Sequence, residues 1–381
     1  MTASLDSLLA DVRAFRIRDV DPHVARWEHE RTMAPEALVK AAELGLLAME
    51  VPAELGGLGL TFSEKLRVLD VLCETSMPFA FSLVNTNNIT SRIATLGSES
   101  HRARFLADLM SGRRLGSTAL TEPGVGSDFG AISMRAERIE GGWRLNGSKA
   151  WITNAAMSDV IVAYAQTDPS SGNAGIASFL IDGTQPGFIR ADPYALLGGH
   201  IIGTGGFELV DYFAPDDDVF SPAGVGFKNA LGGVNAARTY VGSMCCAMIE
   251  ASLRIAVTYG TQRQTFGKPI IEHQGLAWSL AKVANQLEAA RGLTTRAEIA
   301  VESGDPKAAI LPAAHAKKFA TEVAEPCIAA CIQAMGAEGL REEYPLGRHL
   351  TAARIANYVD GSTEIQSDRI AGSLVREYGS N

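Results

Sequence analysis

The sequence has no excess of basic residues, no long apolar run and no segment typical of a signal peptide. The 34 Lys and Arg residues are fewer than the 43 Asp and Glu residues, which gives a net charge of −9. An acidic chain of this kind is a poor candidate for binding nucleic acid or an anionic lipid surface. No stretch approaches the ~18 uninterrupted apolar residues of a membrane-spanning helix, and the first residues lack the apolar core of a signal peptide. We therefore expect a cytoplasmic protein that binds neither nucleic acid nor membrane.

Cysteine is also scarce, and no group of His, Cys and carboxylate residues has the spacing of metal ligands. We therefore predict no metal, and reduced, packed thiols in a cytoplasm. The 46% of apolar and 20% of charged residues exclude a disordered chain. At about 150 residues per domain, the chain has room for two or three domains. The five cysteines are Cys73, Cys245, Cys246, Cys327 and Cys331.

Hydrophobic spacing divides the chain into a helical, a β and a second helical segment. Residues 1–114 mostly follow a helical period, for example over 34–50 and 63–74. Residues 115–226 contain short alternating runs and two turn signals, Gly141-Gly142 and Asn146-Gly147, which predict a β domain of about six to eight strands. Residues 227–381 return to the helical period in long runs over 236–263, 275–303 and 308–335. Such lengths predict an antiparallel bundle.

A glycine-rich loop, ALTEPGVGSDFGA at 119–131, is the densest group of residues with chemical potential. Gly124 and Gly126 have no Cβ, so the backbone N–H groups around Ser127 can approach a phosphate or a flat ring closely. By spacing alone, the loop is equally compatible with a simple turn into the β domain.

Six motifs in one order resemble the acyl-CoA dehydrogenase family. They are TEPGVGSD (121–128), KAWITNA (149–155), RQTFGKPI (263–270), EHQ (272–274), QAMGAEGL (333–340) and YVDGSTEIQ (358–366). The resemblance covers essentially the whole chain. It implies an α+β multidomain fold with an all-α N-terminal domain, a central β-barrel-like domain and a C-terminal four-helix bundle. It also implies an FAD-dependent oxidoreductase acting on CH–CH groups, an acyl-CoA substrate, an electron-transferring flavoprotein as oxidant, and a homo-oligomer, usually a dimer of dimers.

The resemblance also implies roles for individual residues. Taken singly, Trp151 is equally a core aromatic of the β domain and Arg263 a surface charge, and His273 reads as a structural helix histidine. The residues expected to bind FAD are Thr121, Gly126, Ser127, Trp151, Ile152, Thr153, Arg263, Phe266, Gln274, Gln333, Gly336, Ser362 and Glu364. Those expected to bind substrate are Ser127, Asn235, Arg238 and Gly361.

The catalytic base is expected at Asp360. Many members of the family use the Glu of a Tyr-Glu-Gly-Thr motif to remove the α-proton while hydride leaves the β-carbon for flavin N5. The matching residues here are Val359-Asp360-Gly361-Ser362, so the base is shorter by one methylene, about 1.5 Å. Other members place the base near Ala236 and Ala237, which are alanines here. The alternative is that Asp360 caps the helix that follows it.

The acyl group is expected to be short, branched, cyclic or polar. The segment SLVNTNNITSRIATLG, at the expected base of the acyl pocket, carries Asn85, Thr86, Asn87 and Asn88, whereas a long fatty chain needs an apolar slot. These residues are also typical of helix caps. Three other functions stay open: an acyl-carrier-protein-linked dehydrogenase of a biosynthetic pathway, a flavin monooxygenase of the same fold, and a flavin-free binding protein.

Overall fold

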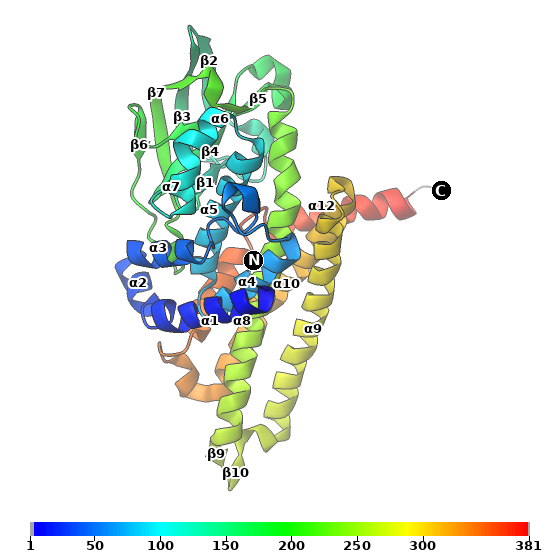
Figure 1. The fold of residues 1–381 in the computed structure, drawn as a ribbon. Coiled ribbons are helices and arrows are strands. Elements are labelled where there is room, and N and C mark those ends of the chain that lie inside the picture. Colours follow the sequence, from blue (N-terminus) through cyan, green and yellow to red (C-terminus); the bar gives the residue numbers. More distant parts are fainter. Residues whose placement is uncertain (1–3, 380–381) are drawn as a thin grey trace.

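The computed structural model describes residues 4–379. Helical segments precede and follow a β segment along the chain, and the sheet lies at one end of the molecule (Figure 1), which confirms the predicted fold class. The first helices are α1 (Leu5–Phe15), α2 (Val24–Glu30), α3 (Pro35–Glu43), α4 (Phe62–Cys73), α5 (Met77–Leu96), α6 (Glu99–His101) and α7 (Ala107–Met110). The bundle contains α8 (Gly226–Gln262), α9 (Gln274–Glu302), α10 (Pro306–Met335), α11 (Leu346–Ala356) and α12 (Thr363–Tyr378).

The central sheet has eight strands in the order β6-β7-β3-β2-β4-β5-β8, with β1 parallel to β4. Strands β4 and β5 are buried almost throughout because the other strands and the helices cover them. The predicted turn at Gly141-Gly142 joins β2 to β3. The strands are β1 (Leu115–Ala119), β2 (Arg135–Ile139), β3 (Gly142–Ile152), β4 (Ser158–Gln166), β5 (Ile176–Asp182), β6 (Phe188–Arg190), β7 (Gly205–Pro215) and β8 (Val219–Ser221).

Local capping explains where several helices begin. Thr61 and Glu64 form a reciprocal capping box at the start of α4, which satisfies two backbone N–H groups that lack a helical partner. The Ser76 hydroxyl caps α5 by accepting a hydrogen bond from Phe79 N. Asp305 caps α10, which continues with a proline at its first position.

Two sequence predictions of local structure are wrong. The helix expected over 34–50 ends at Glu43, because Gly45 adopts φ +75° and its missing Cβ leaves room for Leu58. The turn expected at Asn146-Gly147 lies inside β3, where the register of the strand shifts. Gly147 has φ +140°, and a Cβ there would lie 2.8 Å from Met134 Cα. The glycine therefore permits an irregularity in the strand, not a turn.

One helix of the bundle is as long and apolar as a membrane-spanning helix, which the sequence pattern did not indicate. Helix α8 contains an 18-residue stretch long and apolar enough to span a membrane. However, 67% of this stretch is buried inside the molecule, and the central helix of a globular bundle meets the same criterion. The helix packs mainly against α9 and α10. All five cysteines are free and buried, as predicted.

Two short strands, β9 (Gln264–Thr265) and β10 (Lys268–Pro269), form a hairpin between α8 and α9. Figure 1 shows this hairpin at one end of the molecule and the sheet at the other, with α8 running between them. A helix of 37 residues spans about 56 Å at 1.5 Å per residue. The site residues expected at the two ends of α8 are therefore far apart within one chain.

Candidate active site

Asp360 lies in the loop between α11 and α12, and this loop packs against α8. The residue adopts φ +54°, a left-handed conformation that Asp tolerates better than most residues. Its backbone carbonyl accepts a hydrogen bond from Arg238 Nε at 3.1 Å. Its carboxylate atom Oδ2 is buried without a hydrogen-bond partner among residues 4–379. The cap of α12 is Ser362, whose Oγ accepts from Ile365 N. The Asp360 carboxylate is thus not used for capping and stays free for another contact.

Two buried cations face this loop. Lys317 on α10 is fully buried, and its Nζ donates to the carbonyl oxygen of Gly361 at 2.5 Å and of Asn357 at 3.4 Å. Within the described residues, the side-chain hydrogen bonds of Lys317 and Arg238 go to backbone carbonyls and to the Asn235 amide, not to a carboxylate. Burial lowers the pKa of Lys317 to about 8 and that of Arg238 to about 10, although the charge of Asp360 acts in the opposite direction.

The charges of Lys317 and Arg238 limit how far burial raises the pKa of Asp360. Burial raises the pKa of its carboxyl group, while the charges of Lys317 and Arg238 lower it. An acid with a raised pKa is a better proton acceptor once it is ionised, which is the property required of a general base.

Gly361 and Asn235 complete this part of the predicted substrate site. Gly361 has φ +93°, and a Cβ there would lie 3.2 Å from Arg238 Nη2, so glycine allows the loop to approach the arginine. Asn235 Oδ1 accepts from Arg238 Nη1 at 3.2 Å, and Asn235 Nδ2 donates to the carbonyl of Pro306. The loop, Arg238 and Asn235 thus lie together, and their role in substrate binding stays a prediction.

The glycine-rich loop lies at the rim of the sheet, after β1. Glu122 ties the loop to the segment before β2, because its carboxylate accepts from Ser133 N at 2.6 Å and from Met134 N at 3.0 Å. The same carboxylate pairs with Lys149 Nζ at 2.8 Å, and both side chains are buried. Gly126 and Ser127 are exposed, and the position of a Gly126 Cβ has no atom within 4 Å. The loop therefore has a rigid base and an open face.

Trp151, Ile152 and Thr153 lie at the end of β3, beside this loop: Ala150 N donates to the carbonyl of Thr121. Trp151 adopts φ +59°, and 60% of it is exposed. Ile152 is buried, and Thr153 is partly exposed. An exposed tryptophan held in an unfavourable backbone conformation is typical of a binding surface.

The remaining predicted FAD contacts lie on the helical bundle and its hairpin. Arg263, Phe266 and Gln274 are exposed around the hairpin at the far end of α8; Phe266 is 97% exposed and adopts φ +51°. Gln333 and Gly336 are exposed at the end of α10, and Glu364 is exposed on α12. His273 contacts Thr265 across the hairpin, as expected of a structural histidine.

The residues at the sheet rim fit a flat, largely apolar ring. The open backbone at Gly126 and the exposed side chain of Trp151 are both free to contact such a group.

Sequence reasoning missed four residues that hold these parts in place. Glu122, Lys149 and Asn154 lie inside the recognised motifs, yet nothing in their spacing indicated that they are buried and bonded to one another or to α5. Asn154 Nδ2 donates to the carbonyls of Ser82 and Gly116. Lys317 carries no motif signal, and only its burial beside the Asp360 loop identifies it.

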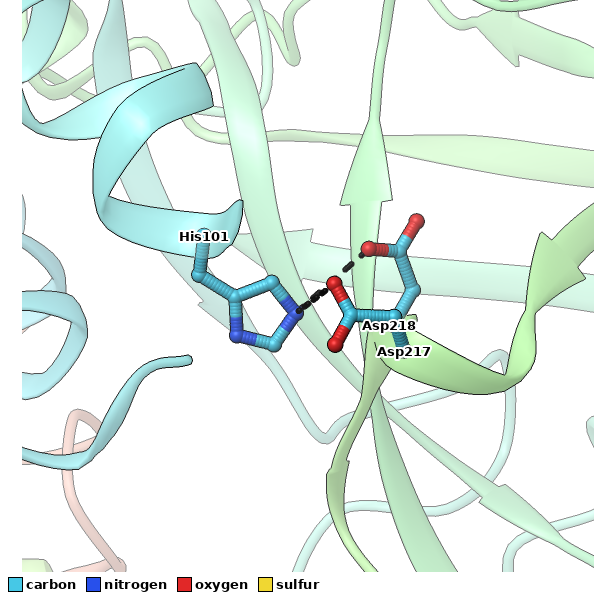
Figure 2. Close-up of side chains that lie close together, drawn as sticks. All are labelled: His101, Asp217 and Asp218. Atoms are coloured by element: carbon cyan, nitrogen blue, oxygen red, sulfur yellow. Dashed lines mark ion pairs between the residues drawn. The ribbon is translucent and has the colours of Figure 1, made fainter. Parts of the chain in front are cut away.

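The structure also brings together a group of ligand-type side chains that the sequence analysis did not predict. His101, Asp217 and Asp218 place ligand atoms within 4.8 Å of one another (Figure 2). Asp218 already forms a two-point ion pair with Arg104, at 2.5 and 3.3 Å. Because a guanidinium occupies the oxygens that an ion would need, we assign these residues to a contact between α6 and the sheet domain.

Comparison with known proteins identifies the family. The acyl-CoA dehydrogenase N-terminal, middle and C-terminal domains match residues 2–113, 117–211 and 224–375. This chain therefore belongs to the acyl-CoA dehydrogenase family, FAD-dependent oxidoreductases acting on CH–CH bonds.

The human short-chain specific acyl-CoA dehydrogenase, a mitochondrial protein, is 34% identical over 98% of this chain and 90% of its own length. The structure of butyryl-CoA dehydrogenase from Megasphaera elsdenii superposes with a TM-score of 0.92 at 30% identity, covering 99% of each chain. PigA, solved with FAD and proline, superposes at 0.89 with 26% identity, covering 98% of each chain. Since one relative is mitochondrial, the cytoplasmic location of this chain stays a prediction.

Proposed function

We propose that this protein dehydrogenates a short, branched, cyclic or polar acyl thioester, with Asp360 as the base. The carboxylate of Asp360 takes the α-proton, and bound FAD supplies the acceptor for the β-hydrogen. The observation that carries the proposal is that Asp360 Oδ2 is buried and has no hydrogen-bond partner among residues 4–379, in a loop that Arg238 and Lys317 hold. A carboxylate that burial has desolvated, but that no other group satisfies, is poised to accept a proton.

Polarisation of the thioester carbonyl is the second requirement of this chemistry, because the α-proton is otherwise too weakly acidic. We propose that a backbone N–H of the Asp360 loop supplies one donor, in the manner of an oxyanion hole. The bond from Arg238 to the Asp360 carbonyl and the bond from Lys317 to the Gly361 carbonyl support this role. Both bonds immobilise the loop, so its N–H groups need no reorganisation during the reaction.

The proposed FAD site combines residues from two copies of the chain. Trp151, Thr153 and the loop at Ser127 lie at the sheet, whereas Arg263 and Phe266 lie about one length of α8 away. We propose that the far-end residues serve the flavin of a neighbouring subunit in a homo-oligomer. Arg263 suits the pyrophosphate, since a guanidinium donates two parallel hydrogen bonds to adjacent oxygens. An electron-transferring flavoprotein is the proposed oxidant.

The test is an anaerobic titration of the purified yellow protein with short, branched, cyclic and long acyl-CoA esters. Bleaching of the visible flavin band by at least one ester supports the proposal and ranks the substrates, because the cofactor carries the redox change. A yellow protein that no CoA ester bleaches contradicts it and favours a carrier-protein substrate or oxygen chemistry. A colourless protein that no added FAD reconstitutes favours the flavin-free alternative.

A further inference from the structure

Tyr194 packs against Trp151, the exposed tryptophan at the end of β3. The two ring centroids are 4.7 Å apart, and the ring planes cross at 59°, which is within the range of favourable aromatic pairs. Because 60% of Trp151 is exposed, the phenol ring covers part of the indole and leaves the rest free for a ligand. The indole thus has both a packing partner and exposed surface.

Tyr194 is the inward-facing residue of an otherwise exposed stretch. Of residues 191–195, it alone is shielded from solvent in part. Its backbone N–H donates to the carbonyl of Thr204 at 2.9 Å. A Cβ on Gly206 would lie 3.4 Å from the Tyr194 hydroxyl oxygen and 2.4 Å from the carbonyl oxygen of Lys149. The glycine therefore leaves room for the phenol where β7 meets β3.

The segment 191–204, which carries Tyr194, is anchored on α2. The Glu28 carboxylate accepts from the backbone N–H of His200 at 2.8 Å. His200 Nε2 accepts from Leu196 N at 3.2 Å, which leaves the proton of the neutral ring on Nδ1. This Nδ1 lies 3.4 Å from Glu28 Oε2. His200 therefore joins the segment to α2 through both its backbone and its ring.

The same segment lies against α11, the helix that leads into the proposed base loop. A Cβ on Gly199, which has φ +72°, would lie 2.3 Å from Ile355 Cδ1. A Cβ on Gly198 would lie 2.8 Å from Thr351 Oγ1. The backbone of the segment thus occupies space that side chains would otherwise fill. The segment links the end of β3, through the Tyr194 ring, to both α2 and α11.

We propose that Tyr194 is a positioning residue that fixes the Trp151 indole against the flavin ring, and that the segment 191–204 holds Tyr194 in place. This inference rests on the proposed function, because it takes Trp151 as part of the flavin site. The backbone of Trp151, with φ +59°, sets the direction of its side chain but not its rotation. The contact with the phenol ring restricts that rotation. An indole ordered in advance loses less conformational freedom when the flavin binds.

The first measurement is the fluorescence of the bound flavin, because an indole in contact with a flavin quenches its emission. FAD-loaded wild type is compared with Tyr194→Leu, which keeps an apolar side chain but removes the ring. We expect the variant to raise the emission and to weaken FAD binding by about two- to tenfold, the range of an aromatic pair. Tyr194→Phe should retain the wild-type values. Equal emission in all three proteins would overturn the proposal.

A double-mutant comparison separates positioning from a general effect on the fold. In the Trp151→Phe background, which lacks the indole, Tyr194→Leu should leave the flavin emission unchanged. An equal rise in both backgrounds would contradict the proposal, because Tyr194 would then act on the flavin without Trp151. Leu197→Ala is the matched control on the same segment. Its side chain is 82% exposed, so its loss should change neither the emission nor the affinity for FAD.

The anchor on α2 is tested at a distance from the flavin. Glu28→Ala removes the acceptor of His200 and should raise the flavin emission, as Tyr194→Leu does. Glu30→Ala is the control on the same helix, because it removes only an exposed ion pair with Arg26, and it should have no effect. Unchanged emission in Glu28→Ala would refute the role of the segment.

Failure of the proposed function gives a different result from failure of this inference. A flavin that binds, but that no acyl-CoA ester bleaches, contradicts the dehydrogenase function and leaves the effect of Tyr194→Leu on emission in place. A protein that binds no FAD would overturn both.

Discussion

At the scale of single residues, the chemistry depends on how a short carboxylate is held. Asp360 reaches about 1.5 Å less far than a glutamate, and its left-handed backbone and the hydrogen bond from Arg238 fix the direction in which it points. The missing methylene therefore has to be compensated by the position of the substrate.

Replacing the base tests this view. Asp360→Asn is expected to retain bound FAD and to lower the rate of flavin reduction by about 10²- to 10⁴-fold, the usual contribution of a general base. Stopped-flow absorbance measures the rate, and the ratio of flavin to protein absorbance measures cofactor content. Asp360→Glu is the companion variant, and it should improve straight-chain substrates. Reduction of the Asn variant at the wild-type rate would remove Asp360 from the mechanism.

The pH dependence of flavin reduction is also a residue-scale prediction. The base must be ionised, so the rate rises with pH through the pKa of Asp360, which burial raises. Lys317, Arg238 and Tyr240 face this carboxylate, and the positive charge of Lys317 lowers its pKa. Lys317→Met should therefore raise the pKa and move the pH profile to higher pH.

The control for this prediction is Lys318→Met. Lys318 is the next residue on α10 and pairs with Glu322 at the surface, so its removal should leave the profile in place. A profile that Lys317→Met does not move would show that Lys317 only supports the loop mechanically.

At the scale of elements, the glycine-rich loop depends on the buried ion pair beneath it. Burial alone would raise the pKa of Glu122, but the charge of Lys149 and the hydrogen bonds from Ser133 lower it. A lowered pKa stabilises the fold above the unfolded-state pKa, and this stability is lost as pH falls through the folded-state value. The loop and β3 are thus expected to lose this stabilisation in acid.

Glu122→Gln tests the ion pair. The variant leaves the Lys149 ammonium buried and unpaired, so we expect a loss of about 3–5 kcal/mol in the free energy of unfolding, together with a lower FAD content. Denaturant unfolding at neutral pH measures the first quantity. Glu137→Gln removes an exposed partner of Arg144 and should change stability by less than about 1 kcal/mol. Equal effects of the two substitutions would contradict the role of Glu122.

At the scale of the whole molecule, the two halves of the proposed FAD site are separated by the length of α8 (Figure 1). A Phe266 side chain that is 97% exposed is unfavourable for an isolated monomer. Several other large apolar side chains on the bundle are exposed as well, including Trp278 and Leu340. These exposures support an assembly in which one bundle covers another.

We predict that the purified protein is a homo-oligomer and that Phe266→Ala weakens both FAD binding and assembly. Light scattering coupled to size exclusion measures the mass, and flavin release on dilution measures cofactor binding. Ile189→Ala, at an exposed position on β6, is the control and should change neither. A wild-type monomer that retains FAD fully would contradict the shared site.

Most of the secondary structure could be predicted because it depends on sequence signals a few residues apart. The long bundle helices, most strands and the motif loops were predicted because hydrophobic period and turn residues act within a few positions. The same rules failed at Gly45 and at Gly147, where contacts with Leu58 and Met134 decide the backbone. The domain boundaries near residues 115 and 227, and the roles of the site residues, stay predictions.

The sequence by itself determined the helical–β–helical order, the motif loops and the position of a carboxylate at Asp360, because each is a short-range property of the chain. Only the tertiary structure decided what surrounds that carboxylate. Arg238 on α8 and Lys317 on α10 come from distant parts of the chain. No periodicity links such residues, since their contacts form only when separate helices pack around a common core.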